Sequence, residues 1–391
     1  MYRHTAIAIL LAAVVAAVAA FATADDDGVN FSQHPGFAKY FAANPPSDEL
    51  PDARISALLE RHRPRLYLPQ GHVGPIDFYR DYIAHGVLRD GQGKVISDKV
   101  TPELLNQYKE APRAEFIHKA WPAGYAPLPV LHARARTATI DLGEGPRSFQ
   151  VLSYHAVFAR SGLPAGLLGW QTIALGLVGD LDDWHQLDHY TAANIVLDDT
   201  DTPVALILQQ HNYHRTYLFG EKVPIADDGR PKIDVAIRSN ELYPHRPGRT
   251  NRRAVSFLNR KAWLYMIGAG PRLFLTADDV TQPARELKYK LRFLVGSDSF
   301  YTFKGYLGAR RWLMGRSGPP GAEYKTLPKL MNFERQLLVG YWRDGNSHDI
   351  GNLTSAIEKP DFHLEFANAQ GAVFRANLLC VKRWRADCAF Q

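Results

Sequence analysis

Hydrophobic and polar positions alternate with a period of two through the centre of the chain, which predicts β-strands. Leu131–Asp141 alternates, a glycine-rich turn follows, and Ser148–Ala159 resumes the alternation, as expected for a hairpin. Tyr190–Leu197 and Val204–His211 form a second pair around a polar turn, and Lys232–Arg238 is a further short strand. The spacing of these strands and turns predicts an antiparallel β-sandwich.

The segment before these strands follows a helical and then an extended pattern. Ile55, Leu58 and Leu59 lie on one face of a short helix predicted over Asp52–His62. Arg63–Pro69 is bounded by prolines and is therefore expected to be extended. These two elements connect an N-terminal adaptor segment to the sandwich.

The last third of the chain is predicted to form an appended α-rich region. Helical periodicity is present at Val255–Ile267 and Ala284–Leu294, and Phe362–Phe366 with Ala372–Lys382 is expected to form a closing hairpin. The predicted fold class is therefore mainly β, and α+β overall. The predicted organisation is a signal peptide at 1–24, an adaptor at 25–60, the sandwich at 61–250, and a basic region with the hairpin at 251–391.

The N-terminus has the pattern of a secretory signal. Met1–Ala24 combines a short basic start, an apolar run and the Ala22-Thr23-Ala24 cleavage pattern before three aspartates. We therefore expect a secreted or periplasmic protein; the alternative is an uncleaved anchor helix. In such a compartment Cys380 and Cys388 can form a local disulfide, with two free thiols as the alternative.

Composition and charge limit the kinds of molecule that the chain is expected to bind. Hydrophobic residues make up 46% of the chain and charged residues 22%, a globular balance that argues against disorder, coiled coil and a multispan membrane protein. The net charge of +6 is concentrated in residues 251–343, where 17 Lys and Arg stand against 6 Asp and Glu. We expect this basic block to meet an anionic lipid or acidic glycan rather than nucleic acid, because export separates the chain from nucleic acid. The alternative is the solvated face of ordinary helices.

One apolar segment lies outside the strand pattern. Leu163–Val178 contains no charged residue but is interrupted by proline and glycine, so it is too short and too broken for a membrane span. It suits a buried core segment, or a loop that makes peripheral contact with a membrane. Trp170 in its middle is compatible with either interpretation.

Acidic and histidine side chains gather where one predicted strand begins and the next ends. Asp183, His185, Asp188 and His189 precede or open the first strand, and His211 closes the second, which returns beside it. Carboxylates and imidazoles suit a divalent cation, Mg²⁺, Ca²⁺, Mn²⁺ or Zn²⁺. The alternative is a solvated acidic turn with histidines at the strand ends.

The sequence does not decide whether the protein is an enzyme. The chain contains no Gly-x-Ser-x-Gly elbow, Walker loop, Gly-x-Gly-x-x-Gly or His-Glu-x-x-His motif. In a metal-dependent hydrolase, His211 or His214 would act as acid or base while Asp183 and Asp188 hold the cation. A further alternative treats residues 185–189 as helical, because His-x-x-Asp-His resembles an inverted zincin protease motif.

Several short motifs resemble a known family. Asp183-Trp184, Gln210-His211, Ser239–Pro244 and Arg65–Pro69 resemble the vacuolar protein sorting-associated protein sixty-two family and, more remotely, the necrosis-inducing Nep-like secreted proteins. The resemblance spans about residues 60–250. It implies a β-sandwich with a cation near the Asp-Trp turn, and in Nep-like members such a site serves binding to membrane glycolipid and lysis.

Two family positions differ here. The family glutamate corresponds to His185 or Asp188, and the family histidine is replaced by Asn240 or Glu241, which adds Glu241 to the candidate ligands. We therefore expect an exported, cation-binding β-sandwich protein that binds lipid or glycan at an envelope or membrane surface. The alternative is a metal-dependent hydrolase acting on a phosphoester, lipid or peptide.

Overall fold

The computed structural model describes part of the chain. The described residues are 48–141, 146–162, 186–189, 191–210, 213–220, 223–245, 253–257, 275–279, 284–309, 318 and 321. The predicted signal peptide, the apolar segment Leu163–Val178, the C-terminal hairpin and the two cysteines lie outside these residues. In the described part, no helix has the length and apolarity needed to cross a bilayer.

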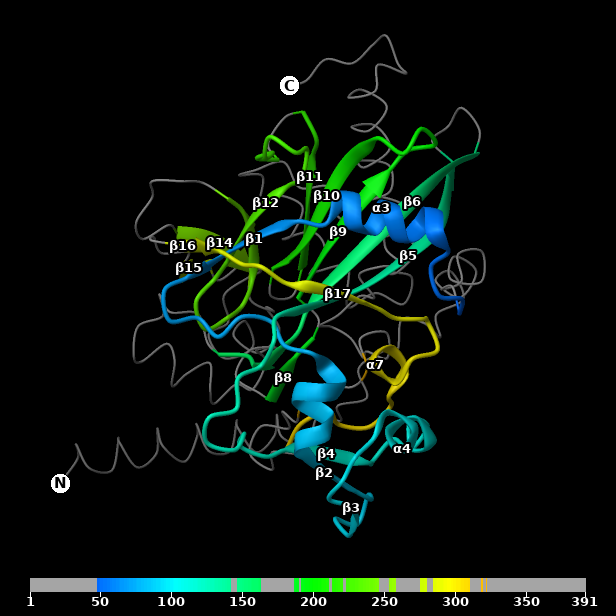
Figure 1. Cartoon of the computed structure of the whole chain (residues 1–391), viewed down its shortest axis with the longest axis vertical. Helices are drawn as coiled ribbons and strands as arrows, with labels where there is room; N and C mark the ends of the chain where they lie inside the picture. Colours follow the sequence, from blue (N-terminus) through cyan, green and yellow to red (C-terminus); the bar gives the residue numbers. More distant parts are fainter. Residues whose placement is uncertain are drawn as a thin grey trace, which may run out of the picture.

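A six-stranded sheet forms the centre of the fold (Figure 1). Its order is β11-β10-β9-β6-β5-β17, and every neighbouring pair is antiparallel except β5 with β17. The strands are β5 (Val130–Asp141), β6 (Pro146–Ala156), β9 (Ala192–Leu197), β10 (Pro203–Gln210), β11 (Tyr213–Leu218) and β17 (Lys290–Phe293). The pairs β5–β6 and β9–β10 confirm the two hairpins predicted from alternation.

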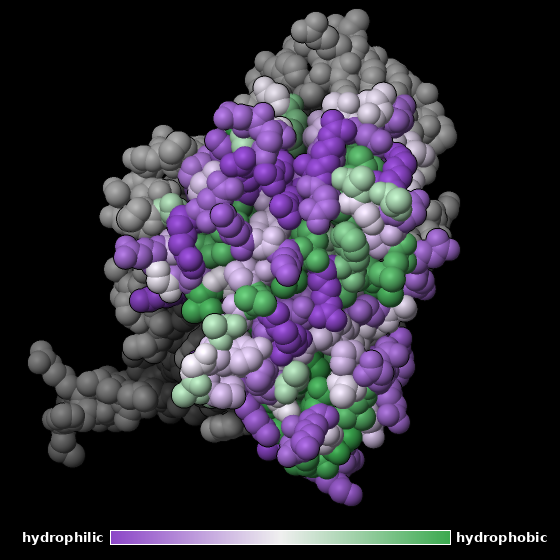
Figure 2. Space-filling model, in the orientation of Figure 1, coloured by the Kyte–Doolittle hydropathy of each residue, from purple (hydrophilic) through white to green (hydrophobic). Residues whose placement is uncertain are grey.

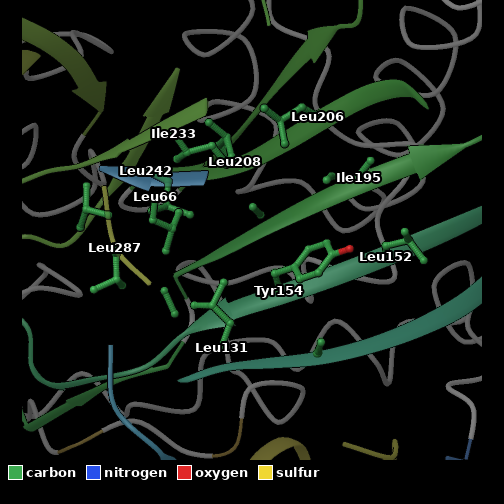
Figure 3. Close-up of a cluster of buried hydrophobic side chains, with 14 of the residues drawn as sticks. Leu66, Leu131, Leu152, Tyr154, Ile195, Leu206, Leu208, Ile233, Leu242 and Leu287 are labelled. Atoms are coloured by element: carbon green, nitrogen blue, oxygen red, sulfur yellow. The ribbon is translucent and has the colours of Figure 1, made fainter. Parts of the chain in front are cut away.

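A second, four-stranded sheet packs on one face of the central sheet. Its order is β13-β12-β1-β16, with β1 parallel to β12. The strands are β1 (Arg65–Pro69), β12 (Lys232–Val235), β13 (Leu242–Pro244) and β16 (Ala284–Glu286). The two sheets share one apolar core, in which Leu66, Ile233 and Leu242 from the second sheet meet Leu152, Ile195 and Leu206 from the first (Figure 3).

Helix α3 (Ala53–His62) extends this second layer. Its N-cap Asp52 accepts a hydrogen bond from the Ile55 backbone N–H at 2.7 Å, and its buried Leu58 and Leu59 enter the shared core. The Tyr154 hydroxyl donates to the Leu59 carbonyl oxygen at 2.9 Å, which fixes the helix to β6. The helix predicted over Asp52–His62 is confirmed.

A third unit lies at the lower end of the molecule in Figure 1. The strands are β2 (Gly86–Arg89), β3 (Val95–Ser97) and β4 (Glu115–His118), with the helical segments η2 (Phe78–Tyr82), η3 (Ile83–His85), α4 (Pro102–Gln107) and α7 (Ser299–Thr302). Phe78, Phe116 and Phe300 centre its own buried cluster. Figure 2 shows apolar residues among hydrophilic ones at this end of the surface.

Two further strand pairs complete the described elements. They are β7 (Phe158–Arg160) with β8 (Gln186–Asp188), and β14 (Arg253–Phe257) with β15 (Leu275–Asp279). The chain is thus mostly β with few helices, which confirms the predicted fold class. The sandwich is not purely antiparallel, since β1–β12 and β5–β17 are parallel pairs.

The two helices predicted in the basic region are wrong where the structure describes them. Residues 255–257 belong to strand β14, and Ala284–Leu294 contains β16 and β17 instead of a helix. β16 pairs with β1, and β17 adds an edge to β5. These inter-strand hydrogen bonds and the burial of Leu287 and Leu294 outweigh the weak local preference for a helix.

Candidate functional site

A pocket of about 650 Å³ lies where the chain leaves β1 and β12. Its lining comes from four separated segments, within residues 71–74, 118–121, 158–162 and 237–240. Apolar surface dominates the lining, with a few polar side chains between, as is usual for small-ligand pockets of roughly 300–1,000 Å³. At the rim, Val73 is 63% exposed.

Asn240 joins three of these segments through its side-chain amide. Its Nδ2 donates to Asp188 Oδ2 and to the Arg160 carbonyl oxygen, each at 2.9 Å. Because Nδ2 faces two acceptors, Oδ1 must face His72, whose Nε2 lies 3.1 Å away and therefore donates. The Asp188 carboxylate is steadied in turn by the Thr191 hydroxyl, which donates to Oδ1 at 2.9 Å.

The backbone around Asn240 adopts unfavourable angles. Among the described non-glycine residues, Leu187, Arg238 and Asn240 have positive φ, of 57°, 72° and 63°. All three are in or beside the Asp188–Asn240 contact, and Asp201 is the further such residue in the described chain. For leucine and arginine, backbone strain of this kind costs on the order of 1–3 kcal/mol per residue and tends to concentrate at ligand sites, whereas asparagine adopts these angles at little cost.

The backbones of two pocket segments are in close contact next to Asn240. The Gly162 N–H donates to the Arg238 carbonyl oxygen at 2.8 Å. A side chain at Gly162 would place its Cβ 3.0 Å from that oxygen, so only glycine fits without displacement. The segments that carry Arg160 and Arg238 are thereby held side by side.

Aromatic rings form another wall of the pocket. His118 stacks on Tyr82 with ring centroids 4.6 Å apart, and Trp121 packs edge-on against His118 at 5.4 Å. The Trp121 indole N–H donates to the Asp81 carbonyl oxygen at 2.6 Å. This bond fixes the orientation of a half-buried aromatic ring at the pocket.

Both pocket histidines are neutral at neutral pH. Burial lowers the pKa of His118 to about 4, and electrostatic interactions with His85 and Arg160 act in the same direction. Burial also lowers the pKa of His72, by more than the hydrogen bond with Asn240 raises it. The positive charge of the lining therefore comes from Arg160 and Arg238.

The structure brings three predicted site residues to this region. Asp188 supports Asn240, His189 is fully buried directly after it, and Glu241 is a buried carboxylate directly after Asn240. The His189 carbonyl oxygen lies 3.2 Å from Nδ1 of His155. Sequence reasoning had placed Asn240 or Glu241 at a family site position, and Asn240 makes the central contacts.

The other predicted ligands are not placed. Asp183, His185 and His211 lie outside the described residues, and for His214 only its backbone position on β11, opposite Gln209, is described. Within the described residues, no three His, Cys, Asp or Glu side chains gather as a cation would require. The described residues alone do not make a cation site, so the metal stays a prediction.

The helical alternative for residues 185–189 is wrong. Gln186–Asp188 is strand β8, which pairs with β7, and Leu187 sits at positive φ within it. Pairing with Phe158 and Arg160 is incompatible with the helix that would put two histidines on one face. A zincin-like protease motif is therefore not formed there.

Sequence reasoning did not single out His72, Trp121, Arg160 or Arg238. His72, Trp121 and Arg160 belong to no predicted strand, helix or motif, and Arg238 enters only as the last residue of the predicted strand Lys232–Arg238. Each of the four comes from a loop or a strand end. The available signal was indirect: His72 lies between Gly71 and Gly74 just after a strand, and Gly162 follows Arg160. Glycines so placed indicate tight turns and close backbone approach.

Comparisons with known proteins do not assign the chain to a family. No protein-family model and no curated protein matches the chain. A solved structure described as "NLPPya in complex with glucosamine" is 16% identical over 51% of this chain and 70% of its own, with a TM-score of 0.27. Another, described as "Toxin fold for microbial attack and plant defense", is 18% identical over 51% and 72%, also with a TM-score of 0.27.

Both structures correspond remotely to the Nep-like part of the resemblance, whereas the vacuolar protein sorting part has no match. With a TM-score of 0.27, neither similarity supports a conclusion about this chain.

Proposed function

We propose that this protein binds a glycan in the pocket around Asn240. The observation that carries the proposal is the combination, in one pocket, of an anchored aromatic ring with polar groups held by a strained loop. A sugar presents apolar C–H faces beside hydroxyl groups, so it needs both kinds of surface. Trp121 offers the ring, and Arg160 and Arg238, which line the same pocket, offer N–H donors.

The proposed setting is a surface outside the cytoplasm. The predicted signal peptide at 1–24 would export the chain. Leu163–Val178 and the basic block at 251–343 remain the proposed contacts with anionic lipid, should the glycan be attached to a membrane. In this arrangement the pocket supplies specificity and the basic block supplies general attraction.

Replacing Trp121 with alanine is expected to weaken glycan binding by about tenfold or more, because a buried aromatic contact contributes roughly 1–3 kcal/mol. Isothermal titration of the full chain with neutral hexose, hexosamine and hexuronate oligosaccharides measures this. The wild type should bind at least one member of the panel.

A second variant separates binding from folding. Val73 is 63% exposed at the pocket rim, so Val73→Trp should fill the entrance without disturbing the core. Val95 is 51% exposed and lies away from the pocket, so Val95→Trp is the matched control. Wild-type affinity in Val73→Trp, or no binding by the wild type to any member of the panel, would overturn the proposal.

A divalent cation is a separate proposal, linked to the hydrolase alternative. It is supported by the residue types of Asp183, His185 and His211 and by the buried carboxylates Asp188 and Glu241 beside Asn240. A cation that binds only the folded state stabilises it by roughly 2.7 kcal/mol at a hundredfold excess over Kd.

We therefore expect Mg²⁺, Ca²⁺, Mn²⁺ or Zn²⁺ to raise the melting temperature of the wild type. The double variant Asp183→Ala with His211→Ala should lose that response. A wild type whose melting temperature ignores all four cations would refute the cation proposal and leave glycan binding unaffected.

A further inference from the structure

The charges around the pocket are all of one sign. Among the lining residues that the structure describes, Arg160 and Arg238 are cationic and none is an aspartate or glutamate. Neither guanidinium forms an ion pair with a carboxylate of the described residues. His72 and His118 are neutral at neutral pH, so they leave this charge unchanged.

The Asp188 carboxylate contacts Asn240 but does not line the pocket. Asp188 lies behind Asn240, and its two oxygens accept from Asn240 Nδ2 and from the Thr191 hydroxyl. Asp188 is buried, whereas Arg160 and Arg238 are exposed. A ligand in the pocket would therefore contact the two arginines and not the Asp188 carboxylate.

The position of Arg238 adds a second, independent observation. Its φ of 72° belongs to a region that glycine and asparagine adopt at little cost and arginine does not. A residue that only had to turn the chain would be glycine or asparagine. An arginine at this strained position indicates that its side chain has a use, and the Gly162–Arg238 backbone hydrogen bond holds its segment beside the one that carries Arg160.

From these observations we infer that the glycan is anionic: a sugar carrying a carboxylate, gripped by Arg160 and Arg238 while its ring lies against Trp121. The inference rests on the proposed glycan-binding function and specifies its ligand. A planar guanidinium matches a carboxylate with two parallel hydrogen bonds, which a neutral hydroxyl cannot reproduce. Because both arginines line the same pocket, an anionic ligand there is attracted by two positive charges.

The test compares sugars that differ only in this group. A hexuronate oligosaccharide should bind the full chain about 10- to 100-fold more tightly than the matched neutral hexose oligosaccharide, the range expected for a hydrogen bond to a charged group. Arg160→Gln and Arg238→Asn should each lose about tenfold or more for the uronate. The loss for the neutral sugar should be clearly smaller, because glutamine and asparagine keep an N–H donor for a hydroxyl group and lose only the charge. Asparagine tolerates the positive φ, so Arg238→Asn removes the charge without adding strain.

Controls distinguish the possible failures. Arg113 is exposed and does not line the pocket, so Arg113→Gln should bind like the wild type. Equal affinity for uronate and neutral sugar, unaffected by either arginine variant, would overturn the anionic inference while glycan binding stands. If the protein preferred a sulfated or phosphorylated sugar, or if inorganic phosphate competed equally well, the inference that the ligand carries a carboxylate would be overturned. No binding of any sugar would overturn the proposed function itself.

Discussion

Replacing Asp81 with alanine is expected to lower the free energy of unfolding by about 3 kcal/mol, because removal of this fully buried carboxylate leaves its hydrogen-bond donors without an acceptor. Asp81 accepts from the Asp77 backbone N–H at 2.9 Å and from the Tyr125 hydroxyl at 2.5 Å. Arg80 adds two charge-assisted bonds of 2.6 Å through Nε and Nη2. The bonds hold η2 to the loop that carries Trp121 and Tyr125.

Two comparison variants define this prediction. Asp81→Asn retains one acceptor oxygen for the Asp77 N–H, so it should lose less stability than Asp81→Ala. Asp98 is exposed, and Asp98→Ala should stay within about 0.5 kcal/mol of the wild type. Urea denaturation at neutral pH measures all three. An Asp81→Ala protein as stable as the Asp98→Ala protein would show that the bonds around Asp81 contribute nothing net.

Acidification is expected to destabilise the protein steeply through His132. Burial lowers the pKa of this fully buried imidazole to about 4, and the positive charge of Arg292 lowers it further. The negative charges of Asp77 and Asp81 raise the pKa but do not outweigh burial. In the unfolded chain a histidine has a pKa near 6.5. The unfolded state therefore takes up its proton first as the pH falls.

The stability contributed by this shift is fully present above about pH 6.5 and is lost as the pH falls toward 4. The total loss for His132 is roughly 3 kcal/mol, since one pKa unit corresponds to about 1.4 kcal/mol. His118, whose pKa burial also lowers to about 4, acts in the same direction. The pKa of Asp77 is lowered as well, mainly by Arg292 against the effect of burial, so its contribution disappears only at more acidic pH.

The measurement is urea denaturation of wild type and His132→Gln at a series of pH values from 7 to 4. The Phe78 backbone N–H donates to His132 Nε2 at 3.1 Å, and the glutamine oxygen can accept the same bond. His132→Gln should therefore fold and lose less stability on acidification than the wild type. Parallel pH profiles for the two proteins would contradict the assignment.

Local patterns were sufficient for the two central hairpins and for the N-terminal helix α3. Alternation predicted the β5–β6 and β9–β10 hairpins, because a strand with one face in the core needs an apolar residue at every second position. Asp52 and the apolar face of Ile55, Leu58 and Leu59 predicted α3, since a helix end and a helix face are both encoded within a few residues.

Local patterns gave the wrong secondary structure where pairing with a distant strand determines it. Ala284–Leu294 carries a helical period but supplies β16 and β17, because β1 and β5 offer unpaired strand edges to it. Residues 185–189 likewise allowed a helix until pairing of β8 with β7 excluded it. Inter-strand hydrogen bonds join residues far apart in the sequence, so a short stretch of sequence does not reveal its pairing partner.

The candidate site divides in the same way. The sequence predicted an export signal and a site around Asp188 and Asn240, and it determined the β-rich class, which the structure confirms; all three rest on adjacent residues. The tertiary structure alone joined Asn240 to His72, Arg160 and Asp188, and set Trp121 and Arg238 around the same pocket. A pocket forms where separated segments converge, and that convergence depends on sheet topology and side-chain packing rather than on any local pattern.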